Sequence, residues 1–547
     1  MVEARLLPMG RSALLVEVAD TGAALALHSR LAPLVGSGGD PWVAVDHVVV
    51  GARTLLVVLR DGRRRDDVGR ACLELAAAAV DDAAPAEDGE VVEVAVRYDG
   101  DDLDEVGRLT GLSPQEVVRA HTGSPWRVGF GGFAPGFAYL VGGDPRLRVP
   151  RRDEPRTRVP AGSVALAGDF SGVYPQDSPG GWQLIGSTDA VLWDADREPP
   201  ALLAPGMTVR FVDVTRPARS PRPAASSGHV LAAAPPAPVT TGALDDFEGE
   251  GRRLEVLATG PLTVVEDLGR DGLADVGVGR SGAADPAAYL LGLRLVGHLL
   301  AEESAHAQTP ASLEVTFGGL VVRAGGDLLV ALTGAPCPAD VDGRPVAHAA
   351  PVVLADGQVL TLGRPRAGVR TWLAVRGGVA VPPVLGSRST DTLSGVGPPV
   401  LSAGDLLPVG PAPAAFPVVE VAPHRPVPEG EVVLDVEPGP RADWCRLDDL
   451  ETQLRTVSSR SNRVGIRLEG KAIQRQPTYA DRELPSEGMV VGAIQVPPGG
   501  EPVVFLADHP VTGGYPVVAV LTPEALARAS QLRPGQPVRL RLARPAL

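Results

Sequence analysis

The sequence predicts a mainly β protein made of two related halves, the first of which carries a small α/β lobe. Short apolar runs alternate with Gly- and Pro-rich turns along most of the chain, a pattern typical of compact β-barrels and sandwiches. At 547 residues the chain also exceeds the roughly 250–300 residues at which a single hydrophobic core stops growing. We therefore expect more than one core.

A repeated sequence element supports the division into two related halves. A glycine pair followed by an aromatic residue occurs at Gly180–Trp182 and again at Gly513–Tyr515. Each copy precedes a Pro-Gly-x-x-Val-Arg turn and strand, at Pro205–Arg210 and at Pro534–Arg539. Gly and Pro are abundant in this chain, so chance similarity is the alternative to duplication. Duplication predicts two β-rich modules whose facing surfaces share one site.

Residues 216–252 are expected to link the two halves. Pro, Ala, Ser and Gly dominate Arg216 to Val239, and the acidic run Asp245–Glu250 follows. A segment of this composition cannot bury enough apolar surface to fold by itself. It separates a first half, residues 1–215, from a second half, residues 253–547.

The α/β lobe is expected over residues 1–85. Strand-like apolar runs stand at Ala13–Val18 and Thr54–Leu59. Helix-compatible patterns cover Gly22–Val35 and the Ala-rich stretch Asp66–Val80.

Residues 86–215 are expected to form a compact β-barrel or sandwich. A strand over Val91–Val96 leads into the acidic cluster Asp99–Asp104. A helix over Pro114–His121 follows, because Ser113 and Glu116 have the spacing of a capping box. Short strands and Gly/Pro turns fill the remainder.

The second half also has the turn spacing of a β-rich module. Within it we expect a helix near Asp285–Leu300, with Asp285 as N-cap and Pro286 in the first helical position. A further helix is expected over Pro440–Leu454.

Lys471 is the only lysine of the chain, and this excludes several enzyme classes. A P-loop needs a lysine followed by Ser or Thr, but Ala472 follows Lys471. Amidase-signature hydrolases use a lysine beside two serines, and a biotin carrier needs a lysine between methionines. The run Gly470-Lys471-Ala472 supplies neither arrangement, so we expect no covalently bound biotin in this chain.

Charge and cysteine content limit the partners and the cellular location. A formal net charge of −15 argues against nucleic acid and anionic membranes as partners. The apolar runs are shorter than the roughly 18 residues that span a bilayer, and the N-terminus lacks the pattern of a secretion signal. Cys72, Cys337 and Cys445 have no spacing typical of disulfides or zinc knuckles. We expect a cytoplasmic protein without a metal site; the oligomeric state stays open, a homo-oligomer included.

Candidate side chains of the first half follow the predicted helix and lie in an arginine-rich loop. His121 can act as a general acid or base near neutral pH, or simply interact with the C-terminal end of its helix. Arg156 and Arg158 lead into the Gly-rich run Pro160–Ser163, where guanidinium and backbone N–H groups suit an anion. A solvated charged loop is the alternative. The aromatic run Trp126–Tyr139 fits either a barrel core or the wall of a ligand pocket.

In the second half, polar groups beside glycine recur in five clusters. Each cluster alone is a turn by default, but five in one half favour a site. The clusters are Glu266–Arg270, Gly279–Pro286, Arg376–Gly378, Gly386–Asp391 and Ser461–Gly465.

These runs resemble a known pair of families. Phe130–Leu140, Pro150–Arg152, Pro155–Ser163, Tyr174–Pro175 and Ser178–Gly186 resemble the B-subunit family of 5-oxoprolinase, also called allophanate hydrolase subunit 1. The C-subunit family, also called allophanate hydrolase subunit 2, is resembled by Asp267–Arg270, Ser281–Ala283, Leu313–Gly319, Leu332–Ala335, Gly386–Asp391, Gln495–Gly499, Leu506–Asp508 and Thr512–Pro516. The arrangement is similar to the carboxyltransferase region of urea carboxylase and urea amidolyase.

The resemblance implies a cyclophilin-like β-barrel in each half, with the α/β lobe on the first: residues 1–85, 86–215 and, after the linker 216–252, residues 253–547. It implies an ATP-dependent enzyme, with magnesium, that opens 5-oxo-L-proline to L-glutamate together with the separate A subunit of 5-oxoprolinase. One alternative is a component that transfers a carboxyl group to urea or another amide with a separate biotin carboxylase or carrier protein. Another is a regulatory protein of the kinase-inhibitor and antagonist type.

The resemblance and the polar clusters together give the candidate site, without assigning a nucleophile. Catalytic roles are expected for His121, Arg156, Arg158, Asp267 and Arg388. Binding of substrate or ATP is expected from Ser163, Ser178, Trp182, Gln183, Arg270, Ser281, Glu314, Ser389, Asp391, Arg463, Gln495, Asp508, Thr512 and Tyr515. This chain departs from the C-subunit pattern at Glu266, where a glutamine is usual, and at Asp271, where a proline is usual. Asn462, Val464 and Ile466 depart from it too, which puts ligand detail in doubt.

Overall fold

The computed structural model describes residues 4–37, 39–79, 90–152, 154–215, 251–298, 309–416, 419–480 and 482–543. Nearly all of the expected linker lies outside these ranges. The described residues form a four-stranded sheet, a seven-stranded sheet, two facing sheets of six and five strands, and a closed seven-stranded barrel. The expected mainly β fold with two barrels is confirmed.

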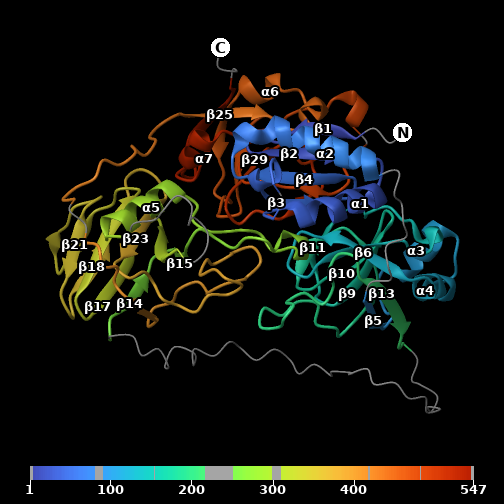
Figure 1. Ribbon diagram of the computed structural model, residues 1–547, viewed down its shortest axis with the longest axis horizontal. Helices are drawn as coiled ribbons and strands as arrows, with labels where there is room; N and C mark the ends of the chain where they lie inside the picture. The colour runs from blue at the N-terminus through green and yellow to red at the C-terminus, as the bar shows by residue number, and fades with distance from the viewer. Residues whose placement is uncertain are drawn as a thin grey trace.

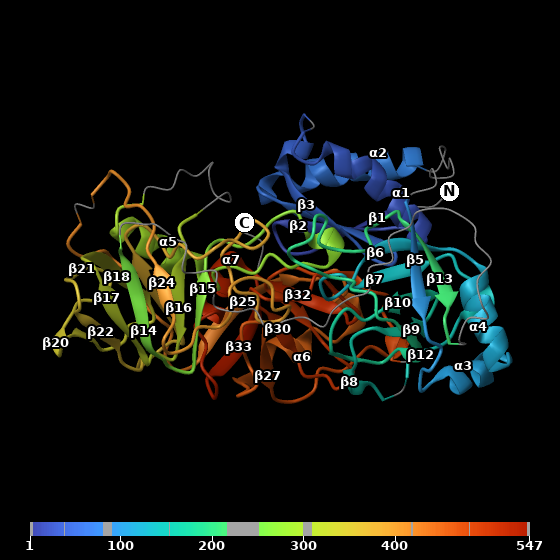
Figure 2. The same ribbon diagram turned by 90° about the horizontal axis from the view of Figure 1, so that it is seen from below.

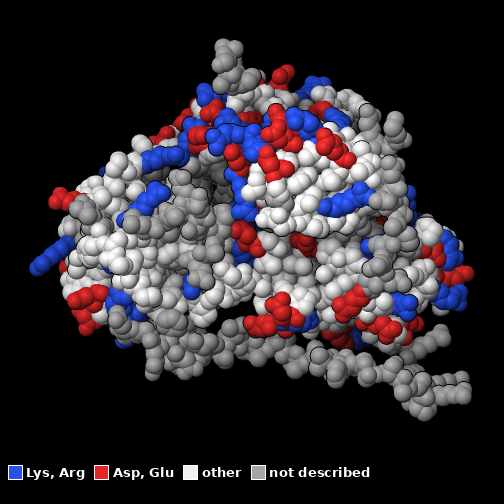
Figure 3. Space-filling model, in the orientation of Figure 1, with Lys and Arg blue, Asp and Glu red and all other residues white. Residues whose placement is uncertain are grey.

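The elements lie in a row with one lobe on top. In Figures 1 and 2 the two facing sheets of the second half lie at one end, the closed barrel in the middle and the seven-stranded sheet of the first half at the other end. The N-terminal lobe covers the closed barrel. Acidic and basic side chains are interspersed on the face in Figure 3, so this face carries no strong field of one sign.

The N-terminal lobe is a sheet with two helices on its outer face. Its strand order is β1-β2-β4-β3. Alternate residues of β2 face opposite sides: Leu14 and Val16 pack beneath the helices, whereas Leu15 packs on the closed barrel. The elements are β1 (Arg5–Pro8), β2 (Ala13–Glu17), α1 (Thr21–Leu31), β3 (Val45–Val50), β4 (Thr54–Leu59) and α2 (Arg65–Ala79).

The expected strands and helices of this lobe are present. The first helix ends at Leu31, earlier than expected, and a short 3-10 turn over Ala32–Leu34 replaces its last turn. Pro33 explains this difference, because proline lacks the N–H that would continue the hydrogen bonds of the α-helix.

The seven-stranded sheet of the first half curls into a nearly closed barrel. Its order is β12-β9-β10-β7-β6-β13-β5, and a bridge between Arg97 and Ser187 joins the two edges. The capping box between Ser113 and Glu116 starts the helix as expected. The elements are β5 (Val91–Val96), α3 (Leu103–Thr110), α4 (Pro114–Gly123), β6 (Trp126–Gly131), β7 (Ala138–Val141), β8 (Arg156–Val159), β9 (Ser163–Ala167), β10 (Phe170–Val173), β11 (Ser178–Gly180), β12 (Gln183–Ser187) and β13 (Thr208–Asp213).

The second half begins with two sheets that share one core, with residues such as Val322 and Leu373 from opposite sheets packed together. Asp285 caps α5, as expected, and Pro286 opens it. The helix ends at Leu295, and the end of the expected range, from residue 299, lies outside the described residues. The elements are β14 (Arg253–Thr259), β15 (Leu262–Glu266), α5 (Pro286–Leu295), β16 (Ser312–Thr316), β17 (Leu320–Gly325), β18 (Leu328–Gly334), β19 (Ala339–Val341), β20 (Arg344–Pro345), β21 (Pro351–Leu354), β22 (Val359–Leu362), β23 (Arg370–Val375) and β24 (Leu406–Pro408).

The closed barrel completes the second half, which thus holds two sheet systems. The prediction of one helix over Pro440–Leu454 is wrong. Only α6 and a 3-10 turn form there, because Cys445 is extended and bridges to Arg475 while Trp444 stacks on Tyr479. The elements are β25 (Val432–Pro438), α6 (Asp448–Glu451), β26 (Leu454–Val457), β27 (Gly465–Glu469), β28 (Glu487–Gly488), β29 (Ala493–Gln495), β30 (Val503–Phe505), β31 (Thr512–Gly513), β32 (Val517–Leu521), α7 (Pro523–Ala529) and β33 (Pro537–Leu542).

The two halves pack directly against each other. Leu15 and Leu56 of the N-terminal lobe share a core with Val520 of the closed barrel. The Tyr139 hydroxyl lies 2.9 Å from the Ser486 hydroxyl across the same boundary. The separated segments therefore form one body around the closed barrel.

None of the described helices has the length and apolar character needed to cross a membrane.

Candidate functional site

A buried network of charged groups joins the two facing sheets to the closed barrel. Its centre is Arg463, in the loop between β26 and β27, which is 1% exposed. The Arg463 guanidinium donates to both carboxylate oxygens of Asp508 at 2.9 Å, and its Nη1 donates to Glu314 Oε1 at 2.7 Å. Its Nη2 lies 3.0 Å from Glu266 Oε1, an ion pair without hydrogen-bond geometry. We call these four residues the Arg463 network.

Glu314 extends the network into β23. Its Oε1 also accepts from Arg370 Nε at 3.0 Å, and its Oε2 accepts from the Ala284 N–H at 3.2 Å. One carboxylate thus holds two guanidinium groups and the segment before α5. Removing a partner from such a buried group leaves a charge uncompensated.

Asp508 ties two loops to the barrel. It accepts from Ser281 Oγ at 2.7 Å and from Thr392, through its N–H at 3.0 Å and its Oγ1 at 2.6 Å. Ser281 has φ of 55°, a left-handed conformation that is uncommon outside glycine. Such backbone persists only where surrounding contacts fix it, and it clusters at functional sites.

Asp267, directly after β15, organises the loop at 386–391. Its carboxylate accepts from the hydroxyls of Ser387 and Ser389 and from the Arg388 N–H, each at 2.6 Å. The Arg388 side chain turns away and donates to the Val381 carbonyl at 2.7 Å. Asp267 therefore has a positioning role in this structure, and Arg388 contributes mainly through its backbone.

Arg270 is buried beside this loop with part of its donor capacity unused. One Nη donates to the Ser389 carbonyl, while Nε and the other Nη find no hydrogen-bond partner among the described residues. Burial lowers the pKa of Arg270, and the Asp391 and Asp267 charges oppose that shift.

Burial and the neighbouring charges shift the pKa values of the carboxyl groups in this region, where carboxylates outnumber guanidinium groups. Burial raises the pKa of Glu266 well above its usual value, and the neighbouring Asp508 and Glu314 add to the shift while Arg463 opposes it. Burial and Asp508 also raise the pKa of Asp391. For Asp508, burial is outweighed by the Arg463 charge and hydrogen bonds, and its pKa is lowered.

His121 does not have the surroundings of a general acid or base. It is fully buried in the first-half barrel, with Nδ1 2.8 Å from the Tyr98 hydroxyl and Nε2 2.9 Å from the Ser171 hydroxyl. Burial lowers its pKa to about 3, so the ring stays neutral at physiological pH. These contacts do not support the expected catalytic role and fit a position in the barrel core.

Arg156 and Arg158 each have an ion-pair partner within the first half. Arg156 makes a two-pronged ion pair with buried Asp102, at 2.8 and 3.0 Å. The Arg158 side chain is 77% exposed and pairs with Asp177 on the surface. Arg156 therefore fastens β8 to the barrel, and Arg158 fits the alternative of a solvated charged loop.

Other first-half candidates also have local structural partners. Trp182 lies in the aromatic core with Phe137, which supports the core interpretation of the aromatic run. Ser163 Oγ donates to the Pro160 carbonyl at 2.8 Å, and Gln183 Nε2 donates to the Pro150 carbonyl at 3.2 Å. Ser178 makes a long contact of 3.5 Å with the Gln176 carbonyl.

Three second-half candidates form a separate group near the first half. Gln495 Nε2 donates to the Tyr515 carbonyl at 3.0 Å. Thr512 is buried in β31, and Tyr515 is 40% exposed.

The structure thus brings together eight predicted residues around the junction: Asp267, Arg270, Ser281, Glu314, Ser389, Asp391, Arg463 and Asp508. Sequence reasoning missed Thr392 and Arg370, and it placed Glu266 and Ser387 in polar clusters without giving either a role. Arg370 had a signal, since it opens a mostly apolar strand. The hydroxyls of Ser387 and Thr392 lie in a run where any member is a plausible turn residue.

Two family models match two separate parts of the chain. A family model described as "Carboxyltransferase domain, subdomain C and D" matches residues 4–203, and one described as "Carboxyltransferase domain, subdomain A and B" matches residues 276–542. The solved structure of TTHA0988 is 33% identical with a TM-score of 0.78, over 97% of this chain and 99% of that one.

Curated relatives match each half separately. The C subunit of 5-oxoprolinase from Escherichia coli (strain K12) is 37% identical over 291 residues, 52% of this chain and 89% of the relative. The B subunit of 5-oxoprolinase from Bacillus subtilis (strain 168) is 47% identical over 128 residues, 23% of this chain and 53% of the relative. Urea amidolyase of Saccharomyces cerevisiae is 30% identical over 330 residues, which is 55% of this chain but 17% of that enzyme. The chain therefore belongs to the carboxyltransferase-domain family of the 5-oxoprolinase B and C subunits, and it holds a B-like and a C-like half in one polypeptide.

Proposed function

We propose that this chain is the fused B and C component of an ATP-dependent 5-oxoprolinase, which opens 5-oxo-L-proline to L-glutamate together with a separate A subunit. The observation that carries the proposal is the direct packing of the B-like half on the C-like half. Arg441 of the closed barrel donates to its neighbour Glu487 and, at 2.7 Å, to Glu17 of the N-terminal lobe. A fused chain with such an interface delivers both components in fixed proportion and orientation.

The chemistry assigned to this chain is positioning and charge stabilisation. Opening a lactam places negative charge on its carbonyl oxygen, and preorganised donors stabilise that charge. The Arg463 network holds in place the segments that carry Ser281 and Thr392, and Asp267 holds the loop that carries Arg388. The network's charged groups are paired with one another, so their role is to fix these segments.

ATP and magnesium do not fit a self-contained site on this chain. Its only lysine lies outside any P-loop pattern. The described residues hold no group of three or more His, Cys, Asp or Glu side chains arranged for a metal ion. In the assembled enzyme ATP would supply a phosphoryl group to activate the amide, and we assign no step of that transfer to residues of this chain.

The proposal is tested by reconstitution. Purified chain mixed with the A subunit, 5-oxo-L-proline and ATP is expected to form L-glutamate, and each protein alone is expected to form far less. Absence of glutamate, together with biotin-dependent ATP turnover on urea, would favour the second candidate.

That second candidate is a urea or amide carboxyltransferase component that acts with a separate biotin carboxylase or carrier protein. It is favoured by the match to urea amidolyase over more than half of the chain. The gene neighbourhood distinguishes the two: an adjacent gene for the A subunit supports the first candidate and a biotin carboxylase gene the second.

A further inference from the structure

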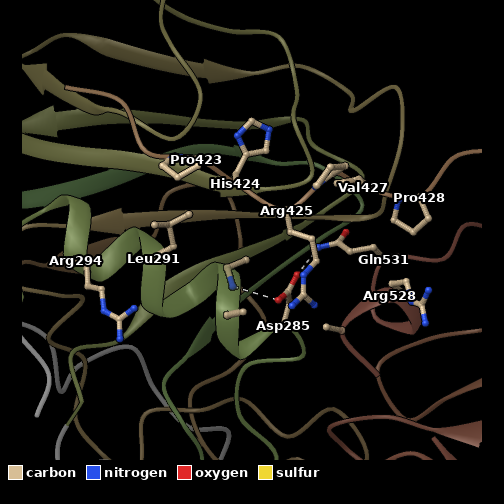
Figure 4. Close-up of a pocket in the computed structure, with 15 residues that line it drawn as sticks. Asp285, Leu291, Arg294, Pro423, His424, Arg425, Val427, Pro428, Arg528 and Gln531 are labelled. Carbon is tan, nitrogen blue, oxygen red and sulfur yellow. Dashed lines mark hydrogen bonds between the residues drawn. The ribbon is translucent and has the colours of Figure 1, made fainter. Parts of the chain in front are cut away.

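A cavity of about 270 Å³ opens where α5, α7 and the segment 423–428 meet (Figure 4). Two polar side chains form its floor, Asp285 and Gln531, and both are more than nine-tenths buried. This volume lies just under the roughly 300–1,000 Å³ typical of drug-sized ligands, so the cavity suits a metabolite with one small ring.

The floor of the cavity is rigidly oriented. Asp285 Oδ1 accepts from the Ala288 N–H at 3.1 Å, and Oδ2 accepts from Gln531 Nε2 at 3.0 Å. Gln531 Oε1 in turn accepts from the N–H groups of Val369 and Arg370, at 3.0 and 2.9 Å. A carboxylate has about four lone-pair positions, so Asp285 can still accept a hydrogen bond from a ligand N–H.

The rim of the cavity is basic. Arg294, Arg425 and Arg528 contribute guanidinium groups, and Figure 4 shows Arg425 beside Asp285 with Arg294 and Arg528 farther away on opposite sides. Arg528 is partly used by Asp435, 3.2 Å away. Guanidinium groups recognise carboxylates through charge-assisted hydrogen bonds, so the rim favours a carboxylate ligand. Leu291 and Val427 supply an apolar wall.

One residue links the cavity to the Arg463 network. The Arg370 backbone N–H binds Gln531, while its side chain reaches both the Ser530 carbonyl and Glu314. The cavity floor and the buried network are thus parts of one hydrogen-bonded structure.

We propose that this cavity binds a small lactam carboxylate, with the carboxylate at Arg425 on the rim and the ring N–H at Asp285. The choice of a lactam as the ligand rests on the proposed function. Within that function it assigns 5-oxo-L-proline to the C-like half, at a site formed by α5, α7 and the segment 423–428.

The first test is direct binding to the purified full chain, with the A subunit and ATP left out. Binding of 5-oxo-L-proline is measured calorimetrically for the wild type and for Leu291→Trp, whose indole fills the cavity from its apolar wall. The expected result is at least a tenfold loss of affinity. Val353→Trp, which places the same side chain at a position 70% exposed on β21, is the control and is expected to bind as the wild type does.

The second test separates carboxylate recognition from ring recognition. Arg425 is exposed, so Arg425→Ala leaves folding intact. It is expected to weaken 5-oxo-L-proline at least fivefold and to leave 2-pyrrolidinone, the same ring without a carboxylate, unchanged. Arg539→Ala, at a surface pair with Glu431, is the matched control. Equal losses for both ligands would overturn the assignment of Arg425.

The outcomes for the cavity and for the proposed function are distinguishable. Wild-type chain that binds no 5-oxo-L-proline, or a folded Leu291→Trp variant that binds it normally, overturns the cavity site. Normal glutamate formation by Leu291→Trp in the reconstituted enzyme overturns the cavity site but leaves the proposed function standing. Binding that Leu291→Trp abolishes, without glutamate formation by the wild type, supports the cavity and counts against the function.

Discussion

At the scale of single residues, Glu266 is the departure from the C-subunit pattern that the structure explains. It is fully buried beside Arg463, and burial raises its pKa well above the usual value, a shift that favours the protonated form. A neutral glutamic acid has nearly the shape and hydrogen-bonding groups of the glutamine that the pattern usually has. The substitution therefore preserves the local chemistry while making it dependent on pH.

Glu266→Gln is accordingly expected to remove a pH dependence of stability. A carboxyl group whose folded pKa is raised above the usual value of about 4.3 stabilises the fold fully below that value and loses the contribution as pH rises toward the folded pKa. The variant should match the wild type near pH 5 and unfold at a higher temperature than the wild type near pH 8. Thermal unfolding at both pH values measures this. A wild type that gains stability between pH 5 and 8 relative to the variant would contradict it.

Arg463→Met tests the centre of the network. The change leaves Glu314 and Asp508 without their main buried partner, so we expect a loss of about 3–5 kcal/mol in the free energy of unfolding. Arg460→Met is the control in the same loop. The Arg460 side chain is 65% exposed, and its ion pair with Glu501 is long, at 3.8 Å. That control should change the free energy by less than about 0.5 kcal/mol. Denaturant unfolding of the three proteins compares them.

At the scale of elements, the loop 386–391 has almost no regular structure of its own and depends on Asp267. Asp267→Ala removes the acceptor of the Ser387 and Ser389 hydroxyls and of the Arg388 N–H. We expect at least a tenfold faster amide hydrogen exchange over this loop, with the two facing sheets unaffected. Asp271→Ala is the control, because Asp271 is partly exposed and forms an ion pair with Arg280 at 3.3 Å. Equal exchange in the two variants would show that another contact holds the loop.

Elements were predictable from the sequence where local signals agree with packing. The capping box at Ser113 and the Asp285-Pro286 start gave correct helix beginnings, because these signals act within a single turn. The helix expected over Pro440–Leu454 failed since Trp444 and Cys445 are drawn into the barrel core. Tertiary packing overrides a weak helical preference there.

At the scale of the whole molecule, the shared core between the halves makes a prediction about assembly. Residues 1–215 and 251–547, produced as two separate chains, are expected to elute together in size-exclusion chromatography, because Leu15 and Val520 pack in one core. Leu15→Asp, which buries an uncompensated charge there, should separate them, while Val353→Asp on an exposed strand should not. Separate elution of the unaltered pieces would mean that the covalent link holds the halves together.

The sequence by itself determined the mainly β fold, the two unlike halves, the family and most of the residues that meet at Arg463. It could do so because apolar periodicity, turn residues and family motifs are properties of short segments. Tertiary structure decided which motifs belong together. Each repeated Gly-Gly-aromatic element begins in a two-stranded sheet outside the barrel strands, yet Trp182 is core and Tyr515 is surface.

Tertiary structure also decided which charged groups are buried. Arg158 and Arg463 are both arginines in polar loops, but one is paired on the surface and the other is enclosed by three carboxylates from distant segments. Burial and the number of partners set the strength of a charge interaction and the direction of each pKa shift. Burial and the number of charged partners depend on residues hundreds of positions apart, so a local sequence pattern cannot predict them.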